Sequence, residues 1–244
     1  MCGDFEHAKA LAEARLATRE SIGRLQEKRL HATLKFWLDP DETHHEVPLP
    51  CGAVADIYDG ERVIEIQNGN FSAFRVKLMR LLEEYPVTVI FPLVRKKTLY
   101  WVDPQTGERS TPRPSSKTGG FQDAAPELLY IHELLFLPNL TLRLQLIDVE
   151  EYKLQDGWGN EGKRGAHRLE RVPLAPGEAL ELHTYADLKR CLPPKLCSPF
   201  TAADFQKAMR YRGRKLSAAL KLFLKTGILT REKQGKGYVY TISE

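Results

Sequence analysis

The stretch VADIYDGERVIEIQ, residues 54–67, constrains the fold of this chain more than any other segment. It has the pattern of two β-strands joined at Asp59-Gly60, a dipeptide typical of hairpin turns. Asp56 and Glu65 lie among apolar neighbours on these two strands. A carboxylate is costly to bury unless a positive charge or hydrogen bonds meet it. We therefore expect the hairpin to bring both acids to a cation.

Asp56, Glu65 and Gln67 are expected to converge at one edge of the sheet. Side chains alternate along a strand, so Glu65 and Gln67 share a face, and Asp56 comes from the neighbouring strand. Two adjacent carboxylates repel, and one takes up a proton unless a cation holds both. Mg²⁺ (or Mn²⁺) suits such oxygen ligands, with water and a substrate phosphate completing its shell. The same residues also allow a simpler interpretation, in which Asp56 caps a turn and Glu65 pairs with a surface lysine.

Two further charged residues are candidates for the same site. Glu27 lies on the apolar face of a helix predicted over residues 21–38, where an acid needs a partner. Lys77 flanks the apolar stripe of a helix predicted over residues 71–85 and can reach the two acids. The alternatives are that Glu27 bonds a backbone amide and that Lys77 is a solvated helix lysine.

The elements predicted over residues 21–95 follow the order helix, three strands, helix, strand, and the last strand is the apolar run VTVIFPLV. Inside this order stand Asp56, eight intervening residues and Glu65-x-Gln67, and the chain thereby resembles the PD-(D/E)XK nuclease superfamily. The resemblance implies an αβββαβ core of the α/β class with a mixed sheet. It also implies metal binding by Asp56 and Glu65, with Glu27 as the extra acid that some members carry on the first core helix.

The sequence departs from the motif of that superfamily at two positions. No proline precedes Asp56, where Val54-Ala55 stand. Gln67 occupies the place of the lysine that contacts the attacking water, and an amide carries no positive charge. The resemblance implies either that Gln67 serves there, as in some restriction endonucleases, or that Lys77 supplies the lysine from the next helix, as in other members.

The positive charge of the chain is concentrated in residues 201–244. They hold ten Lys or Arg against three acidic residues, a net charge of +7, whereas the whole chain has only +4. From residue 179 onward the pattern predicts three helices, with Thr201 as an N-cap and Gly227 as a C-cap, and then a hairpin turning at residues 234–237.

This C-terminal pattern resembles a winged helix-turn-helix domain. The resemblance implies that the third helix enters the major groove of duplex DNA and that the hairpin touches the DNA backbone. The same charges can instead serve solubility, and winged helices also mediate protein contacts. The candidate DNA-binding residues are Arg212, Arg214, Lys215, Lys221, Lys233 and Lys236.

Three parts are expected along the chain: a helical arm over residues 1–20, a nuclease-like domain over 21–178 and a winged-helix domain over 179–244. The arm is either an extension or a contact between two copies in a homodimer. The four cysteines form no Cys-x-x-Cys pair, no apolar run approaches membrane-span length, and the N-terminus lacks a signal-peptide core. We expect a cytoplasmic protein with free thiols and no membrane partner.

Together these features predict a metal-dependent endonuclease that hydrolyses phosphodiester bonds of double-stranded DNA, in DNA repair or in defence. A first alternative is a DNA-binding regulator or damage-recognition protein on the same fold, which does not cut. A second alternative is a DNA-repair glycosylase acting on a flipped base. The absence of a helix-hairpin-helix signature with a lysine nucleophile argues against the glycosylase.

Overall fold

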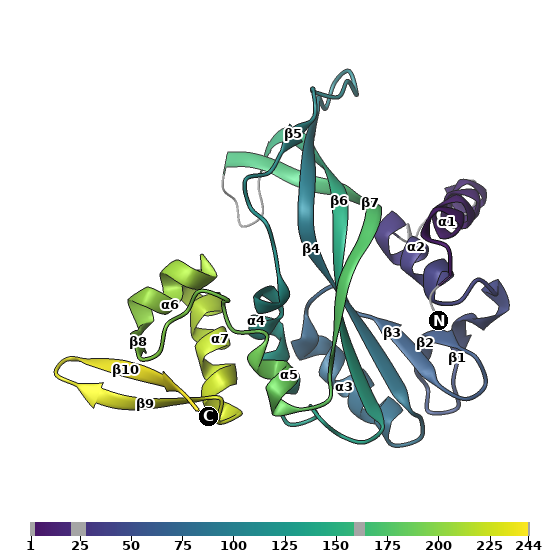
Figure 1. The fold of residues 1–244 in the computed structure, drawn as a ribbon. Coiled ribbons are helices and arrows are strands. Elements are labelled where there is room, and N and C mark those ends of the chain that lie inside the picture. Colours follow the sequence, from purple (N-terminus) through teal and green to yellow (C-terminus); the bar gives the residue numbers. More distant parts are fainter. Residues whose placement is uncertain (1–2, 21–27, 159–163, 244) are drawn as a thin grey trace. The chain divides into compact units, whose positions relative to one another are not determined.

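The computed structural model describes residues 3–20, 28–158 and 164–243 (Figure 1). The chain forms two compact units, each assembled from three separate stretches. The first unit holds Met1–Val47, Val94–Gly119 and Leu146–Glu178. The second holds Pro48–Leu93, Gly120–Gln145 and Ala179–Glu244. Three long strands contribute residues to both units, and they are β4 (Val87–Val102), β6 (Leu140–Trp158) and β7 (Arg164–Leu182).

The larger sheet is mixed. Its strands follow the order β1-β2-β3-β4-β6-β7, and β5 (Arg113–Pro114) pairs with β4. The predicted hairpin is confirmed, because β2 (Val54–Tyr58) and β3 (Val63–Ile66) are antiparallel neighbours. β3 and β4 are parallel, and the helix α3 (Phe71–Leu82) makes the crossover that parallel neighbours need. The prediction of an α/β fold with a mixed sheet is therefore confirmed.

The strands that carry the two acids lie in the core of the second unit. All four residues of β3 are buried. α3 covers them with a stripe of buried side chains at spacings of three and four, as an amphipathic helix does. The stripe consists of Phe71, Phe74, Leu78 and Leu81. This packing fixes α3 against the sheet and places its flanking residues beside β3.

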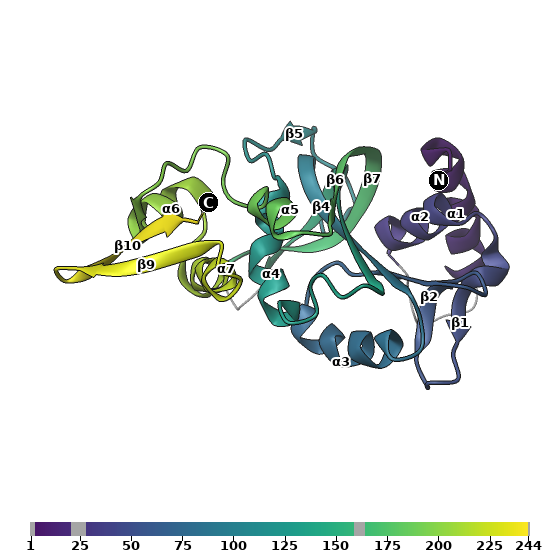
Figure 2. The same cartoon turned by 60° about the horizontal axis from the view of Figure 1, so that its bottom comes forward.

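A run of short helical turns stands where one helix was predicted over residues 123–135. It consists of η2 (Phe121–Ala124), α4 (Ala125–Leu128) and η3 (Leu129–Ile131). At its start the Asp123 side chain accepts a hydrogen bond from the Gly120 amide over 3.0 Å, and Pro126 lies in the first turn of α4. We call these residues, 121–131, the helical-turn segment. It contacts α3 on one side and α7 on another, within the second unit (Figures 1 and 2).

The C-terminal part of the second unit begins after β7 with α5 (Tyr185–Lys189). α6 (Ala202–Met209) and α7 (Gly213–Lys225) follow, and then the hairpin of β9 (Leu229–Gln234) and β10 (Gly237–Ile242). The short strand β8 (Phe200–Thr201) pairs with β10, which gives a small sheet of order β8-β10-β9. The predicted N-cap is confirmed, because the Thr201 side chain accepts a hydrogen bond from the Asp204 amide.

The first unit carries α1 (Phe5–Glu20) and α2 (Arg29–Leu38), followed by the turn η1 (Glu42–His44) and β1 (His45–Pro48). α1 packs on α2, with the rings of Phe5 and Trp37 edge to face at 5.3 Å. Together α2, β1, β2, β3, α3 and β4 give the predicted order of helix, three strands, helix and strand. Within the described ranges, no helix has both the length and the apolar character that crossing a membrane needs.

Element boundaries differ from the predictions in two places. The boundary expected near residues 175–180 falls inside β7, because Leu180 and Leu182 continue the strand with buried side chains. The residues after 179 also share a compact unit with Pro48–Leu93. The helix was expected over residues 21–38, but α2 begins at Arg29 with the extended Lys28 as its N-cap, and Glu27 lies outside the described residues.

A network of buried charges joins α1, α2 and β1 in the first unit. Lys35 is fully buried, and its Nζ lies 3.1 Å from Oε1 of Glu46. The other oxygen of Glu46 lies 3.1 Å from Nη2 of the buried Arg15. Nη1 of Arg15 donates to Nδ1 of His45 over 3.1 Å, and burial is the main reason that the pKa of His45 is lowered. Glu46 therefore neutralises two buried cations, while His45 stays neutral and accepts a hydrogen bond.

Replacing Glu46 tests this network. Glu46→Gln keeps the size and the left-handed backbone (φ 56°) of the residue but leaves Lys35 without its carboxylate. We expect the free energy of unfolding to fall by more than about 1 kcal/mol, because the exposed Glu46 carboxylate is a counter-charge of the buried Lys35 ammonium. Urea denaturation measures the change. Glu6→Gln is the matched control, because Glu6 pairs with Lys9 on the exposed face of α1 and such pairs contribute less than about 1 kcal/mol. Equal effects of the two substitutions would contradict the assignment.

Candidate functional site

The structure brings Asp56 and Glu65 together on β2 and β3. Ile57 pairs with Ile64 in the antiparallel register, and continuing that register sets Asp56 opposite Glu65. The backbone amide of Asp56 donates to Oε1 of Glu65 over 3.3 Å. The amide of Ile66 donates to Oδ2 of Asp56 over 2.7 Å. Each carboxylate therefore binds the backbone of the other strand, and the predicted convergence is observed for the two acids.

The burial of Glu65 opposes its ionisation. Only 3% of the residue is exposed. Burial, followed by the negative charge of Asp56, raises the pKa of Glu65 to about 7. A pKa near 7 means that Lys77 and the hydrogen bond from the Asp56 amide only partly offset the cost of a second negative charge at neutral pH. The site therefore favours an additional positive charge.

Lys77 supplies part of that positive charge. Its Nζ lies 2.6 Å from Oε2 of Glu65 and donates a hydrogen bond to it, which lowers the pKa of the glutamate against the effect of burial. Lys77 stands beside the buried stripe of α3, so the packing of the helix on β3 determines its reach. The start of α3 is fixed too, because the Phe71 amide donates to Oε2 of Glu127 in α4 over 3.0 Å. The expectation that Lys77 reaches the site agrees with the structure, in which it contacts Glu65.

The structure places Gln67 differently. Its backbone amide donates to the carbonyl oxygen of Ile90 on β4 over 2.9 Å. Its side-chain amide donates to the carbonyl oxygen of Gly69, in the turn that leads into α3. Among the described residues, no hydrogen bond joins this side chain to Asp56 or Glu65. Gln67 therefore holds the turn, and the polar side chain that contacts Glu65 is Lys77.

The oxygen atoms of the acidic pair form a small donor set for a metal ion. In the part of the chain that the structure describes, no cluster of three or more His, Cys, Asp or Glu side chains is placed to hold a metal. Mg²⁺ needs fewer, since it is commonly held by one or two carboxylates with water and substrate phosphate as its other ligands. Asp56 and Glu65 meet that need with two carboxylates, and burial together with the charge of Asp56 raises the pKa of Glu65. Glu27, the predicted third acid, lies outside the described residues.

The predicted DNA-binding residues are exposed in the C-terminal part of the second unit. Arg212 precedes α7, Arg214 and Lys215 stand in its first turn, and Lys221 stands farther along it. Lys233 and Lys236 stand at the β9–β10 turn. α7 itself is anchored to the helical-turn segment, because the hydroxyl of Tyr211 donates to Oδ1 of Asp123 over 2.7 Å.

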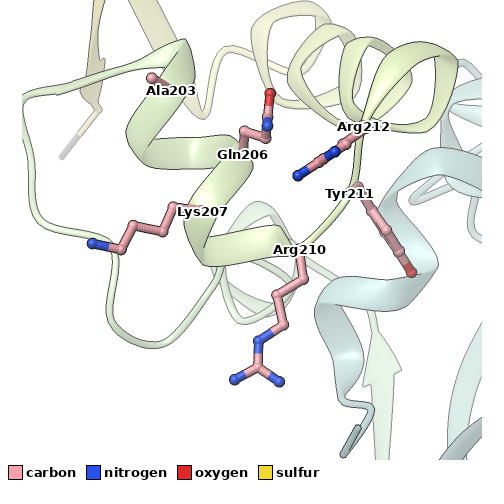
Figure 3. A pocket seen from close by; sticks show the side chains of 6 residues that line it. All are labelled: Ala203, Gln206, Lys207, Arg210, Tyr211 and Arg212. Atoms are coloured by element: carbon pink, nitrogen blue, oxygen red, sulfur yellow. The ribbon is translucent and has the colours of Figure 1, made fainter.

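Sequence reasoning missed a basic hollow next to these residues. A cavity of about 360 Å³ lies along α6 and the turn into α7 (Figure 3). Lys207 and Arg210 line it but were not among the predicted contacts. The high positive charge of residues 201–244 was the available signal, although the sequence did not indicate which cations share a cavity. The lining residues are Ala203, Gln206, Lys207, Arg210, Tyr211 and Arg212.

Comparison with known proteins gives a family and a relative. Residues 28–183 match the family described as a domain of unknown function (DUF8091). The chain is also similar to an uncharacterized protein of Treponema pallidum (strain Nichols), with 27% identity over 223 residues, 90% of this chain and 87% of the relative. That similarity covers more of the chain than residues 28–183. No solved structure matches this chain.

The ionisation of Glu65 provides a direct test of the site. Carbon-13 NMR titration of its carboxyl group is expected to give a midpoint at about pH 7. Asp56→Asn should lower that midpoint because it removes a neighbouring negative charge, and Lys77→Met should raise it because it removes the ammonium. A midpoint near the ordinary glutamate value of 4.5 in the unmodified protein would contradict the arrangement.

The same raised pKa predicts how stability depends on pH. Between pH 4.5 and about 7 the folded protein binds a proton on Glu65 that the unfolded chain has already lost. The contribution of Glu65 to the free energy of unfolding therefore falls as pH rises through this window, by up to about 3 kcal/mol. Glu65→Gln should lack this component when urea denaturation is repeated across the window. A fall of the same size in both proteins would assign it to other groups.

Proposed function

The chain belongs to the DUF8091 family, and we propose that it is a metal-dependent nuclease that hydrolyses phosphodiester bonds in DNA. One observation carries the proposal. Glu65 is buried opposite Asp56 with a pKa of about 7, and Lys77 donates to it from α3. Two acids and a lysine in one place are the groups that phosphodiester hydrolysis assisted by a metal ion needs.

The arrangement of the elements supports the same proposal. The order from α2 to β4, with β2 and β3 antiparallel and β3 and β4 parallel, agrees with a core of the PD-(D/E)XK type. The helices α5, α6 and α7 followed by the β9–β10 hairpin agree with a winged helix-turn-helix. The exposed cations of α7 and the hairpin turn suit the phosphates of duplex DNA, which they would bind with a strong dependence on salt.

Asp56 and Glu65 would hold Mg²⁺ or Mn²⁺. When bound, such an ion polarises a phosphate oxygen and lowers the pKa of a bound water. Glu65 loses its proton near pH 7, so the affinity of the pair for a cation rises with pH through that range. Lys77 orients the Glu65 carboxylate and keeps an ammonium beside the reacting phosphate, where a hydrogen-bond donor stabilises developing negative charge.

Plasmid nicking tests the proposal. We expect the protein to nick supercoiled plasmid with Mg²⁺ or Mn²⁺ and to leave it intact with EDTA. Asp56→Asn and Glu65→Gln, which keep the shape of each side chain, should reduce the rate at least about 100-fold. Glu61→Gln is the matched control, because Glu61 is an exposed acid in the turn of the same hairpin. Nicking in EDTA, or nicking that survives both site substitutions, would contradict the proposal.

A binding protein without cleavage is the second candidate, and one observation favours it. Lys77 already lies 2.6 Å from Glu65, so the acids can act as a purely structural charge cluster. Gel-shift binding of duplex DNA that ignores EDTA, with no nicking, would select this candidate. Release of a base without strand scission would instead select a glycosylase.

Lys77 separates cleavage from binding. Lys77→Met should lower the nicking rate about 100-fold, because it removes the donor beside the scissile phosphate. The affinity for duplex DNA should remain unchanged, since the predicted DNA contacts lie on α7 and the hairpin. Arg80→Met is the control, because Arg80 is an exposed cation on the same helix. If both substitutions slow nicking equally, Lys77 has no special part in the reaction.

A further inference from the structure

The basic hollow lies where α6 ends and α7 begins. Gln206 and Lys207 come from α6, Arg210 is its C-cap, and Arg212 is the N-cap of α7. Figure 3 shows the Arg212 side chain reaching toward α6, between Gln206 and Arg210. The cavity of about 360 Å³ is open to solvent and has room for a phosphate group with its ester oxygens.

Three exposed cations and no carboxylate line the hollow. Lys207, Arg210 and Arg212 form no ion pair with a described carboxylate. The pKa of the nearby Asp204 is nonetheless lowered by hydrogen bonds from Thr201 and, to a smaller extent, by the charge of Lys207. Three cations around one cavity repel one another unless an anion joins them. The hollow therefore has the electrostatic character of an anion site.

The backbone at the end of α6 and the ring of Tyr211 are held in place before any ligand binds. Arg210 has a left-handed backbone (φ 55°), and its amide donates to the carbonyl oxygen of Gln206 over 2.9 Å. Tyr211 is held from two sides, by the hydrogen bond to Asp123 and by Nζ of Lys215 lying 5.8 Å from the centre of its ring. Fixed walls lower the entropy lost when a ligand is bound.

We propose that this hollow binds a phosphodiester group of a DNA backbone, beside the strand contacted by α7. One guanidinium group can bind two phosphate oxygens at once, and Arg210 and Arg212 each carry such a group. Gln206 and Lys207 add further hydrogen-bond donors. The site suits a strand rather than a free nucleotide, because the ring of Tyr211 already contacts Lys215 and no other ring lines the hollow for a base. The proposal rests on the DNA-binding part of the proposed function and not on cleavage.

The dependence of affinity on salt tests the proposal. Binding of a fluorescent duplex is measured by anisotropy in EDTA at several salt concentrations, so that cutting plays no part. Arg210→Gln and Arg212→Gln should each weaken binding about tenfold and make the logarithmic salt dependence less steep by about 0.9, the change for one phosphate contact. Arg212→Lys should recover the slope but only part of the affinity, because an ammonium cannot bind two oxygens in parallel.

The matched control is Arg62→Gln. It removes the same charge from an exposed arginine of the second unit, but Arg62 is paired with Asp59 and lies in the β2–β3 turn. It should leave the salt slope unchanged. The three substituted residues are exposed and outside the core, and a thermal melt of each of the four variants verifies folding. Variants at 210 and 212 that keep the slope of the unmodified protein would overturn the proposal, and so would a protein that binds no duplex.

The source of the phosphate is distinguished with two duplexes of the same sequence. One carries 5′-phosphates and the other carries 5′-hydroxyls. We expect equal affinity for both, because the hollow takes a phosphate within the strand. Affinity that depends on the 5′-phosphate and is lost in Arg210→Gln would replace the proposal with a terminal-phosphate site. Binding with the expected slopes but without nicking would refute only the nuclease function, so the two failures are separable.

Discussion

Two carboxylates on neighbouring strands repel each other most strongly where water cannot screen them. Glu65 is buried opposite Asp56, and the structure answers this repulsion with backbone amides of both strands and with the ammonium of Lys77. The position of Lys77 depends in turn on the apolar stripe of α3, which packs over β3. The parallel crossover from β3 to β4 is thus the element that allows the acidic pair to exist in the core.

The helical-turn segment, residues 121–131, connects the acidic pair with the basic helix inside the second unit. Glu127 binds the start of α3, and Asp123 binds Tyr211 at the start of α7. The helix that carries Lys77 and the helix that carries the exposed cations are therefore anchored to the same short stretch of chain. In the proposed function, this stretch sets the spacing between bound DNA and the site of hydrolysis.

Much of this architecture could be predicted because its signals are local. The hairpin followed from Asp59-Gly60, α3 from its apolar period, and the N-cap from Thr201. The sequence did not reveal features that depend on contacts between different elements or on an unusual backbone conformation. The Gln67 side chain bonds to Gly69, and the strand β7 runs through the expected domain boundary. Lys207 and Arg210 line one hollow at the end of α6, where Arg210 has a left-handed backbone. Periodicity cannot indicate such partners, since each involves residues in different elements or an unusual backbone.

The central claim is that Asp56 and Glu65 hold a divalent cation. Paramagnetic broadening by Mn²⁺ tests it most directly, because the effect is confined to nuclei near the ion and needs neither DNA nor catalysis. The account predicts that Mn²⁺ selectively broadens the amide signals of Asp56 and Ile66 at pH 8, that excess Mg²⁺ reverses the broadening, and that Asp56→Asn abolishes it. Signals that remain sharp, or broadening that persists unchanged in Asp56→Asn, would contradict the claim.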